Sequence, residues 1–274
     1  MIATQTRVTY AKNIGFRKRL NEKVDDYFES KQIAKRDNLA MYWKTVVILG
    51  WVIGTWTFIL FSPSILLIKL IACIVLGLGI AGVGFSVGHD ANHGGYSNHK
   101  SVNYLIGLIY DVIGISSYLW KFRHNFLHHT YTNILGHDVD IYGDGLVRMT
   151  PHLERKWYHK FQHIYINFIY MFLPFYWSFS DVEIILFKRK YHNHIIPINT
   201  KQILILLTGK VVWLWLFIGL PIWLGYSFIE TIVGFCITYM TYGLMIGNVF
   251  SLAHVLEPAQ FIEPSPQSNQ VDDE

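Results

Sequence analysis

Charged residues are scarce in this chain of 274 residues: they make up 15% of it, whereas ordinary soluble domains hold about 25%. Cysteine is scarcer still, because two residues cannot form a disulfide framework or a cysteine metal cage. These shortages exclude a disordered chain, a collagen-like repeat and a protein that binds nucleic acid through its charge density. Instead, 52% of the residues are hydrophobic and 13 are histidines. This combination indicates a membrane protein with a metal site.

Four apolar runs are each about as long as the ~20 residues that a membrane crossing needs. Short turns at 62–64 and 224–227 join them in two pairs, and such turns allow only tight helical hairpins. The sequence therefore predicts an all-α integral membrane fold, with four transmembrane helices in two hairpins and a histidine-rich helical cap. The runs are 43–61, 65–87, 203–223 and 228–253. The predicted segments are an N-terminal segment (1–42), hairpin 1 (43–87), the cap (88–202), hairpin 2 (203–253) and a C-terminal tail (254–274).

Two lysines and a glycine-rich stretch stand out within the predicted spans. Lys69 is about one turn from the start of the second span, where its stem can reach the membrane interface. Lys210 lies inside the third run, so either its side chain also reaches the interface or the crossing begins a turn later.

Gly77, Gly79 and Gly82 fit a dinucleotide-binding pattern, but they lie inside a span and not in a strand–turn–helix unit. We expect these small residues to let helices approach closely.

The basic residues are distributed unevenly along the chain. Of the 23 Lys and Arg residues, 10 lie in 1–46 and 11 lie in 88–202, whereas the two hairpin turns hold none. If each hairpin crosses the membrane and returns, 21 of the 23 lie on one face, which the positive-inside rule makes cytoplasmic.

The start of the chain has no apolar core or cleavage site of a signal peptide. Residues 11–36 have the pattern of a solvated basic helix on the membrane surface.

The region between the hairpins is mixed. Residues 102–119 are apolar except for Asp111, and we expect them to lie in or against the membrane interface. Residues 157–177 are rich in aromatic side chains, which collect where lipid meets water. We therefore predict a helix at the membrane boundary there.

Six histidines form the candidate metal site, and the hairpin topology puts them all on the same face. His89 and His93 follow the second span with the i, i+4 spacing that places two side chains on one face of a helix. His124 and His128 repeat this spacing, and His129 adds an adjacent third imidazole. The sixth, at the end of the fourth span, is His254. Imidazoles gathered in this way are typical of a polyhistidine metal site.

The remaining histidines are not predicted to be ligands. The residues at 99, 137 and 152 are isolated in sequence and are expected to be ordinary core or interface residues. His159 and His163 also have i, i+4 spacing, but they have no third neighbour and lie in the aromatic stretch. His192 and His194 lie beside a basic stretch and are typical of a solvated turn.

The stretches that hold these clusters resemble the membrane fatty acid desaturases, most of all the bacterial acyl-lipid or acyl-CoA group that includes the front-end desaturases. The resemblance extends from about Met41 to Phe261. The matching stretches are GHDANHGGYS (88–97), WKFRHNFLHHTYTN (120–133), GHDVDI (136–141) and LAHV (252–255). The resemblance implies two non-haem iron ions at the cytoplasmic surface, held by histidine boxes. The first box matches His89 and His93, the second matches the cluster at 124–129, and the end of the fourth crossing matches His254.

The resemblance also implies an activity. Members of this family are oxidoreductases that act on paired donors, reduce O2 to water and introduce a cis double bond into a fatty acyl chain. The implied partners are the lipid bilayer, a fatty acyl-CoA or acyl lipid, and a separate electron donor that is ferredoxin- or cytochrome b5-like, with no nucleic acid. The implied location is a bacterial inner membrane. A related diiron hydroxylase or ketolase, or a non-catalytic membrane metal-binding remnant, stays open as an alternative.

In a metal-bound histidine, the ring nitrogen that does not bind the metal usually donates a hydrogen bond to a nearby acceptor. Asp90, Asp138 and Asp140 are the candidates here, although the last two can equally cap the turns of their loop. Imidazole also suits zinc and copper, so the choice of iron rests on the resemblance. No side chain is predicted to act as a catalytic acid, base or nucleophile.

The chain departs from the family pattern in one respect. The family's third box, His/Gln-x-x-His-His, comes well after the fourth crossing, and the 20 residues that follow His254 contain no such box. We therefore expect a truncated or degenerate desaturase that binds fewer than two irons and does not desaturate lipids by itself. Some relatives use an asparagine one turn before the last histidine. That position is Phe250 here, and Asn248 is out of step, so neither is expected to be a ligand.

Overall fold

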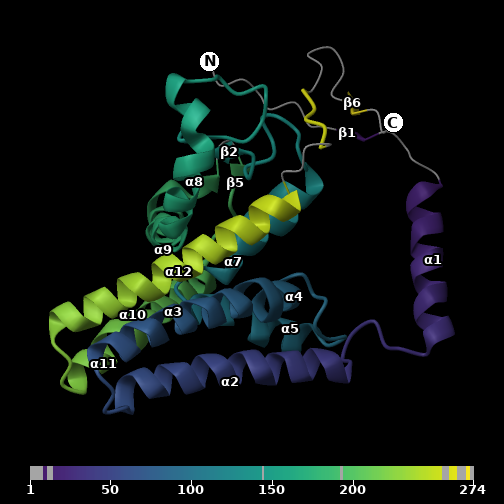
Figure 1. Cartoon of the computed structure of the whole chain (residues 1–274). Helices are drawn as coiled ribbons and strands as arrows, with labels where there is room; N and C mark the ends of the chain where they lie inside the picture. Colours follow the sequence, from purple (N-terminus) through teal and green to yellow (C-terminus); the bar gives the residue numbers. More distant parts are fainter. Residues whose placement is uncertain are drawn as a thin grey trace.

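Long helices dominate the computed structural model (Figure 1). The structure describes residues 9–10, 15–143, 145–191, 194–254, 259–263 and 270–271, without the side chains of 9–10, 254 and 270–271. Within these ranges, four helices are long and apolar enough to cross a membrane: Leu39–Phe61, Leu66–Asn92, Thr200–Trp223 and Phe228–Ala253. The predicted all-α membrane fold with four spans is thereby confirmed.

Hairpin 1 consists of α2 (Leu39–Phe61) and α3 (Leu66–Gly82), and α3 continues through the π-helical turn η1 (Val83–Gly88) into α4 (His89–Asn92). The side chain of Asn38 begins α2 by accepting a hydrogen bond from the Met41 amide at 2.8 Å. The apolar run predicted a span that ends at 87, before any histidine. The helix instead continues to Asn92 and carries His89 in its last turn, and the first residue after it with a left-handed backbone is Gly94 (φ +72°).

Hairpin 2, like hairpin 1, pairs one continuous helix with one that contains a π-helical turn. α10 (Thr200–Leu214), the π-helical turn η5 (Trp215–Gly219) and α11 (Leu220–Trp223) form the third span, and α12 (Phe228–His254) forms the fourth. Asn199 caps the start of α10 by accepting from the Lys201 amide at 2.9 Å. Glu230 accepts a hydrogen bond from the Ser227 amide at 2.9 Å in the first turn of α12.

The glycines of α3 allow close contact with its neighbours, as the sequence predicted. A Cβ atom on Gly77 would lie 2.4 Å from the Thr238 carbonyl oxygen of α12, and one on Gly79 would lie 2.9 Å from Val52 Cγ2 of α2. Only a residue without a side chain fits such positions. α3 is therefore the helix on which α2 and α12 both pack.

The two lysines in the spans have different surroundings. Lys69 Nζ donates to the hydroxyl of Tyr226 at 2.6 Å, which links α3 to the turn of hairpin 2. For Lys210, the predicted reach to the membrane interface is wrong, whereas the alternative that the crossing begins a turn later stays a prediction. Its side chain is only 13% exposed and points into the protein, where Nζ donates to the Gly114 carbonyl at 2.6 Å and lies 3.7 Å from Asp181 Oδ2. Buried oxygen atoms thus replace the interfacial water that the prediction assumed.

The first part of the cap is a bent pair of helical segments. α5 (Lys100–Gly107) and α6 (Ile109–Val112) are followed by α7 (Ser117–Trp120) and the π-helical η2 (Lys121–His128), at an angle of 113°. The apolar segment 102–119 is therefore not one interfacial element. The bend requires Gly114, which has φ +89° and whose Cβ would lie 2.7 Å from the Trp213 ring.

The second part of the cap is also bent, by 61°. It contains the 3-10 turn η3 (Trp157–Phe161), α8 (Gln162–Met171), α9 (Leu173–Glu183) and the π-helical η4 (Ile184–Lys188). The single boundary helix predicted over 157–177 breaks because Pro174 has no amide hydrogen and restricts the residue before it. Trp157, Phe168 and Phe179 are exposed, as expected of side chains that face lipid.

Helix α1 (Phe16–Lys31) lies apart from the other helices and buries none of its side chains (Figure 1). It falls inside the segment predicted as a basic surface helix. The described strands are two residues long and form three pairs. They are β1 (Thr9–Tyr10) parallel to β6 (Gln270–Val271), β2 (Tyr142–Gly143) antiparallel to β3 (Val147–Arg148), and β4 (Lys190–Tyr191) antiparallel to β5 (His194–Ile195).

Candidate metal centre

The first pair of histidines lies at the two ends of α4, where the helix leaves the predicted membrane region: His89 is its first residue and His93 is its C-cap. The His93 amide donates to the His89 carbonyl at 2.9 Å, the i→i+4 bond of an α-helix. The two rings therefore lie on one face and meet edge to face, with their centroids 4.4 Å apart and an angle of 61° between their planes. Burial and the neighbouring histidine rings lower the pKa of His93, which favours the neutral form that binds metals.

The second cluster lies on η2, and its π-helical geometry decides how the three rings are arranged. The His129 amide donates to the His124 carbonyl, an i→i+5 bond that brings these two residues one above the other. Their Nε2 atoms lie 3.2 Å apart. In an α-helix, His129 would share a face with Asn125 and not with His124. The sequence predicted the i, i+4 pair, but no pattern in it predicted this turn.

The two clusters meet in space. The ring centroid of His93 lies 5.1 Å from that of His124 and 5.0 Å from that of His129. One ring nitrogen from each of His89, His93 and His124 lies within 4.8 Å of the others. The structure thus brings five of the six predicted residues together, counting His128 at 5.4 Å from His124. Their role as metal ligands stays a prediction.

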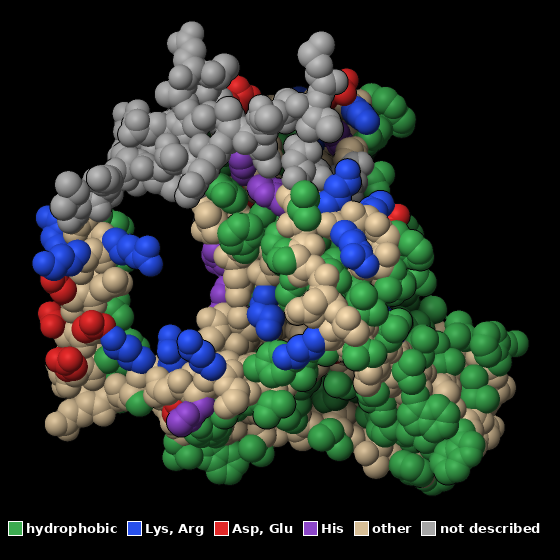
Figure 2. All heavy atoms as spheres, turned by 180° about the vertical axis from the view of Figure 1, so that it is seen from behind, with side chains coloured by type: hydrophobic (Ala, Val, Ile, Leu, Met, Phe, Trp, Pro, Cys, Tyr) green, Lys and Arg blue, Asp and Glu red, His purple; other side chains and the backbone are tan. Residues whose placement is uncertain are grey.

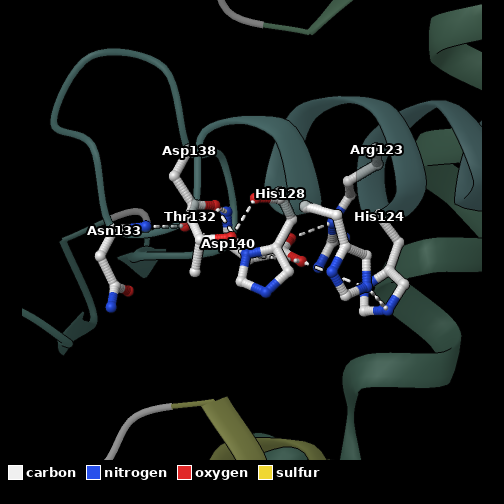
Figure 3. A network of polar contacts seen from close by, with 8 residues as sticks. Arg123, His124, His128, Thr132, Asn133, Asp138 and Asp140 are labelled. Carbon is white, nitrogen blue, oxygen red and sulfur yellow. Dashed lines mark hydrogen bonds and ion pairs between the residues drawn. The ribbon is translucent and has the colours of Figure 1, made fainter. Parts of the chain in front are cut away.

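Asp138 is completely buried and accepts hydrogen bonds from three groups (Figure 3). The Nδ1 atom of His128 lies 3.0 Å from Oδ2, and the amides of Asn133 and Asp140 bond to the two oxygens at 2.8 and 2.9 Å. The contacts that both suggested roles need, one to a histidine ring and two to loop amides, therefore occur together, and the role toward a metal-bound histidine stays a prediction. Because Nδ1 faces Asp138, Nε2 lies on the opposite side of the ring, as it does in a metal-bound histidine whose other nitrogen donates to a carboxylate.

Asp140 pairs with a residue that the sequence did not predict. Arg123 Nε donates to Asp140 Oδ1 at 2.6 Å, and Asp140 Oδ2 lies 3.7 Å from His124 Nδ1 (Figure 3). Burial raises the pKa of the Asp140 carboxyl, but Arg123 and the nearby histidines lower it more, so the net shift is downward. A carboxylate held in the charged form is a suitable acceptor for the second ring nitrogen of a metal-bound histidine.

The third candidate acceptor, Asp90, lies differently. Lys44 Nζ of α2 donates to its Oδ2 at 2.6 Å, whereas Oδ1 is 3.8 Å from His89 Nδ1, too far for a direct hydrogen bond. Asp90 therefore mainly joins α4 to the first span.

The two histidine-bearing helices are also linked through Asn125, Asn92 and Trp120. Asn125 Nδ2 donates to the Asn92 carbonyl at 2.9 Å, and Asn92 Nδ2 donates to the Gly107 carbonyl at 3.3 Å. The Trp120 ring, which packs on His124 at a centroid distance of 4.4 Å, lies 5.5 Å from the rings of both His89 and His93. Sequence reasoning missed all three, and the only available signal was their closeness to the histidines along the chain.

The sixth predicted ligand, His254, is the last residue of α12, and its side chain lies outside the described part of the structure. Phe250, one turn earlier, packs 5.9 Å from the His89 ring and 6.1 Å from the His124 ring, so the end of α12 reaches the cluster. Asn248 instead donates to Asn167 Oδ1 at 2.9 Å.

Other described histidines lie away from the five. His152 Nδ1 is 3.0 Å from Glu263 Oε1, and His159 Nδ1 accepts from the Lys156 amide at 3.1 Å. His137 and His194 pack around Tyr131, with their rings 6.0 Å apart. His192 lies outside the described residues.

Comparison with known proteins gives consistent matches. The family model described as fatty acid desaturase matches residues 64–270. The chain is 54% identical to the sn-1 linoleoyl-lipid 6-desaturase of Arthrospira platensis, over 100% of this chain and 74% of that protein. It is 47% identical to the protein of the same name from Synechocystis sp., over 99% of this chain and 76% of that protein. An acyl-lipid (8-3)-desaturase of Physcomitrium patens is 28% identical, over 95% of this chain and 55% of that protein.

Proposed function

Because the chain belongs to the fatty acid desaturase family of membrane oxidoreductases, we propose that its histidine cluster supplies the ligands that this chain contributes to the two-iron site of an acyl-lipid desaturase. The observation that carries this proposal is the meeting of α4 and η2, which puts ring nitrogens of His89, His93 and His124 within 4.8 Å of one another. An ion placed among them would be reached from both segments at once.

The donor set fits iron. Five clustered imidazoles, with His254 as a sixth, are more than one iron needs if it keeps open positions for O2, so they can serve as part of the ligand set of two ions. Iron with O2 supplies the oxidising power that removes hydrogens from unactivated carbons, which acids, bases and nucleophiles lack. The protein's part is to hold the rings: Asp138 fixes the orientation of His128, and Asp140 faces His124.

We propose a lipid-linked linoleoyl chain as the substrate and carbon 6 as the site of the new double bond. The support is the similarity over nearly the whole chain to two proteins whose names state this specificity. α4 continues directly from the second span, so the cluster lies at the end of a helix that is long and apolar enough to cross the membrane.

The histidine-bearing face is proposed to be cytoplasmic, in a bacterial inner membrane, with electrons from a separate ferredoxin- or cytochrome b5-like donor. Figure 2 supports the orientation: Lys and Arg side chains gather on the half of the face near α1, whereas hydrophobic side chains cover the end formed by the hairpin turns. This matches the 21 of 23 basic residues that fall in 1–46 and 88–202.

Iron analysis of the purified chain, reconstituted with ferrous iron without oxygen, tests the site. We expect His124→Ala and His93→Ala to bind much less iron than the wild type. His163→Ala is the matched control, since His163 belongs to an i, i+4 pair outside the cluster. Equal iron loss in this control, or unchanged binding in the cluster variants, contradicts the assignment.

Lipid analysis of cells that contain linoleoyl lipids tests the reaction. A new double bond at carbon 6 supports the substrate proposal and contradicts the expectation that this chain does not act by itself. Hydroxy or keto acyl chains would instead identify a hydroxylase or ketolase.

A further inference from the structure

A cluster of buried charged residues lies outside the metal centre. It joins Lys210 of the third span, Asp181 of α9 and Asp111 of α6. Lys210 Nζ is 3.7 Å from Asp181 Oδ2, and the two side chains are 13% and 5% exposed. Asp111 is 6% exposed and interacts electrostatically with Lys210 and with Lys121 of η2.

Burying charged groups away from water costs free energy, so charged groups that are buried usually have a structural or functional role. A single buried ion pair gains little over apolar residues of the same volume, whereas an unpaired buried charge is strongly unfavourable. Ionisable side chains within membrane segments usually face the protein interior and serve a function. The proposed reaction uses none of these four groups.

The turn at 113–116 is what the cluster holds in place. The Gly114 carbonyl accepts from Lys210 Nζ at 2.6 Å and from Ser178 Oγ at 2.7 Å. The Ser116 amide donates to Asp181 Oδ2 at 2.6 Å. This turn contains the 113° bend that leads the chain from α6 into α7 and η2, which carries the second histidine cluster.

The segment that follows the turn also carries Arg123. Arg123 Nε holds Asp140, and the other oxygen of Asp140 faces His124. The placement of η2 therefore also sets the position of this ion pair beside the candidate ligands.

We propose that Lys210 and Asp181 are positioning residues: they set the place and direction of the helix that carries His124, His128 and His129. This inference rests on the proposed function for its metal, but the placement of the helix can be measured without one. Lys210 would act through the turn at 113–116, since it contacts no candidate ligand in the described structure.

The test compares Lys210→Met, Lys210→Arg and the matched control Lys69→Met, a lysine of the neighbouring span that lies at the hairpin turns. Hydrogen exchange of the full metal-free chain in detergent reports the placement of 117–129. Titration with Co2+, followed by its visible absorption, reports the site. We expect Lys210→Met to raise exchange in 117–129 and weaken Co2+ binding by about tenfold. Lys210→Arg should restore both, and Lys69→Met should change neither.

Each outcome supports or contradicts either the inference about Lys210 or the proposed function. Unchanged exchange in a folded Lys210→Met protein overturns the inference, and so does raised exchange with unchanged Co2+ binding. A wild-type chain that binds no Co2+ contradicts the proposed function, while the exchange data still decide whether Lys210 places the helix. If Lys210→Met does not fold, the double variant Lys210→Met/Asp181→Asn removes the unpaired acid. If hydrogen exchange of 117–129 in that variant equals that of the wild type, the inference is wrong.

Discussion

The side-chain amide of Asn125 donates to the main-chain carbonyl of Asn92 at 2.9 Å and thereby joins the two helices that carry the histidine clusters. Asn92 is the last residue of α4, and Asn125 follows His124 on η2. The distance between the clusters is therefore set by a polar contact as well as by apolar packing.

Asn125→Ala removes this contact. We expect the free energy of unfolding to fall by about 1 kcal/mol, the usual net value of one hydrogen bond. We also expect metal affinity to fall, because His93 and His124 would separate more easily. Chemical unfolding and Co2+ titration measure the two effects. The matched control is Asn98→Ala, since the Asn98 side chain takes part in no bond described here; an equal loss of affinity in this control would contradict the explanation.

Replacing Asp138 should weaken metal binding much more than replacing Asp90. Asp138→Ala takes away the acceptor that orients His128, so metal affinity should fall about 10–100-fold. Asp90→Ala should cost much less affinity, because Asp90 is 3.8 Å from His89 Nδ1 and bonds mainly to Lys44. Co2+ titration of both variants decides this, and similar losses in the two would show that distance to the ring is not the cause.

Gly77 should tolerate no side chain. Gly77→Ala puts a methyl group 2.4 Å from the Thr238 carbonyl oxygen, so α3 and α12 must move apart. We expect a loss of about 1–3 kcal/mol, typical of overpacking. Gly54→Ala is the control, since nothing lies within 4 Å of a Cβ at that position. Thermal unfolding in detergent compares the two, and equal stability would contradict the close helix contact.

Removal of the metal should destabilise the protein. A ligand that binds only the folded chain adds about 2.7 kcal/mol when present at 100 times its dissociation constant. We therefore expect a chelator to lower the midpoint of thermal unfolding of the metal-loaded chain. The same chelator should have little effect on His124→Ala. A chelator effect of the same size in both proteins would mean that the stabilising metal binds elsewhere.

Much of the fold was predictable because the membrane imposes simple rules. Apolar runs of about 20 residues specify spans, and short turns specify hairpins. The spans found begin and end within a few residues of the predicted ones, except that the second continues to Asn92. The bends near Gly114 and Pro174 were missed because each depends on packing or backbone angles that an apolar pattern does not report.

By itself, the sequence determined which histidines can share a face, since the i, i+4 spacing of His89 and His93 is realised by an ordinary α-helix. Only the tertiary structure decided that η2 winds as a π-helix, that His129 therefore lies over His124, and that Lys210 turns inward to a carbonyl and a carboxylate. Local spacing fixes neighbours along one helix. The partners of a buried charge, and the winding of a helix packed against other helices, depend on atoms contributed by distant segments.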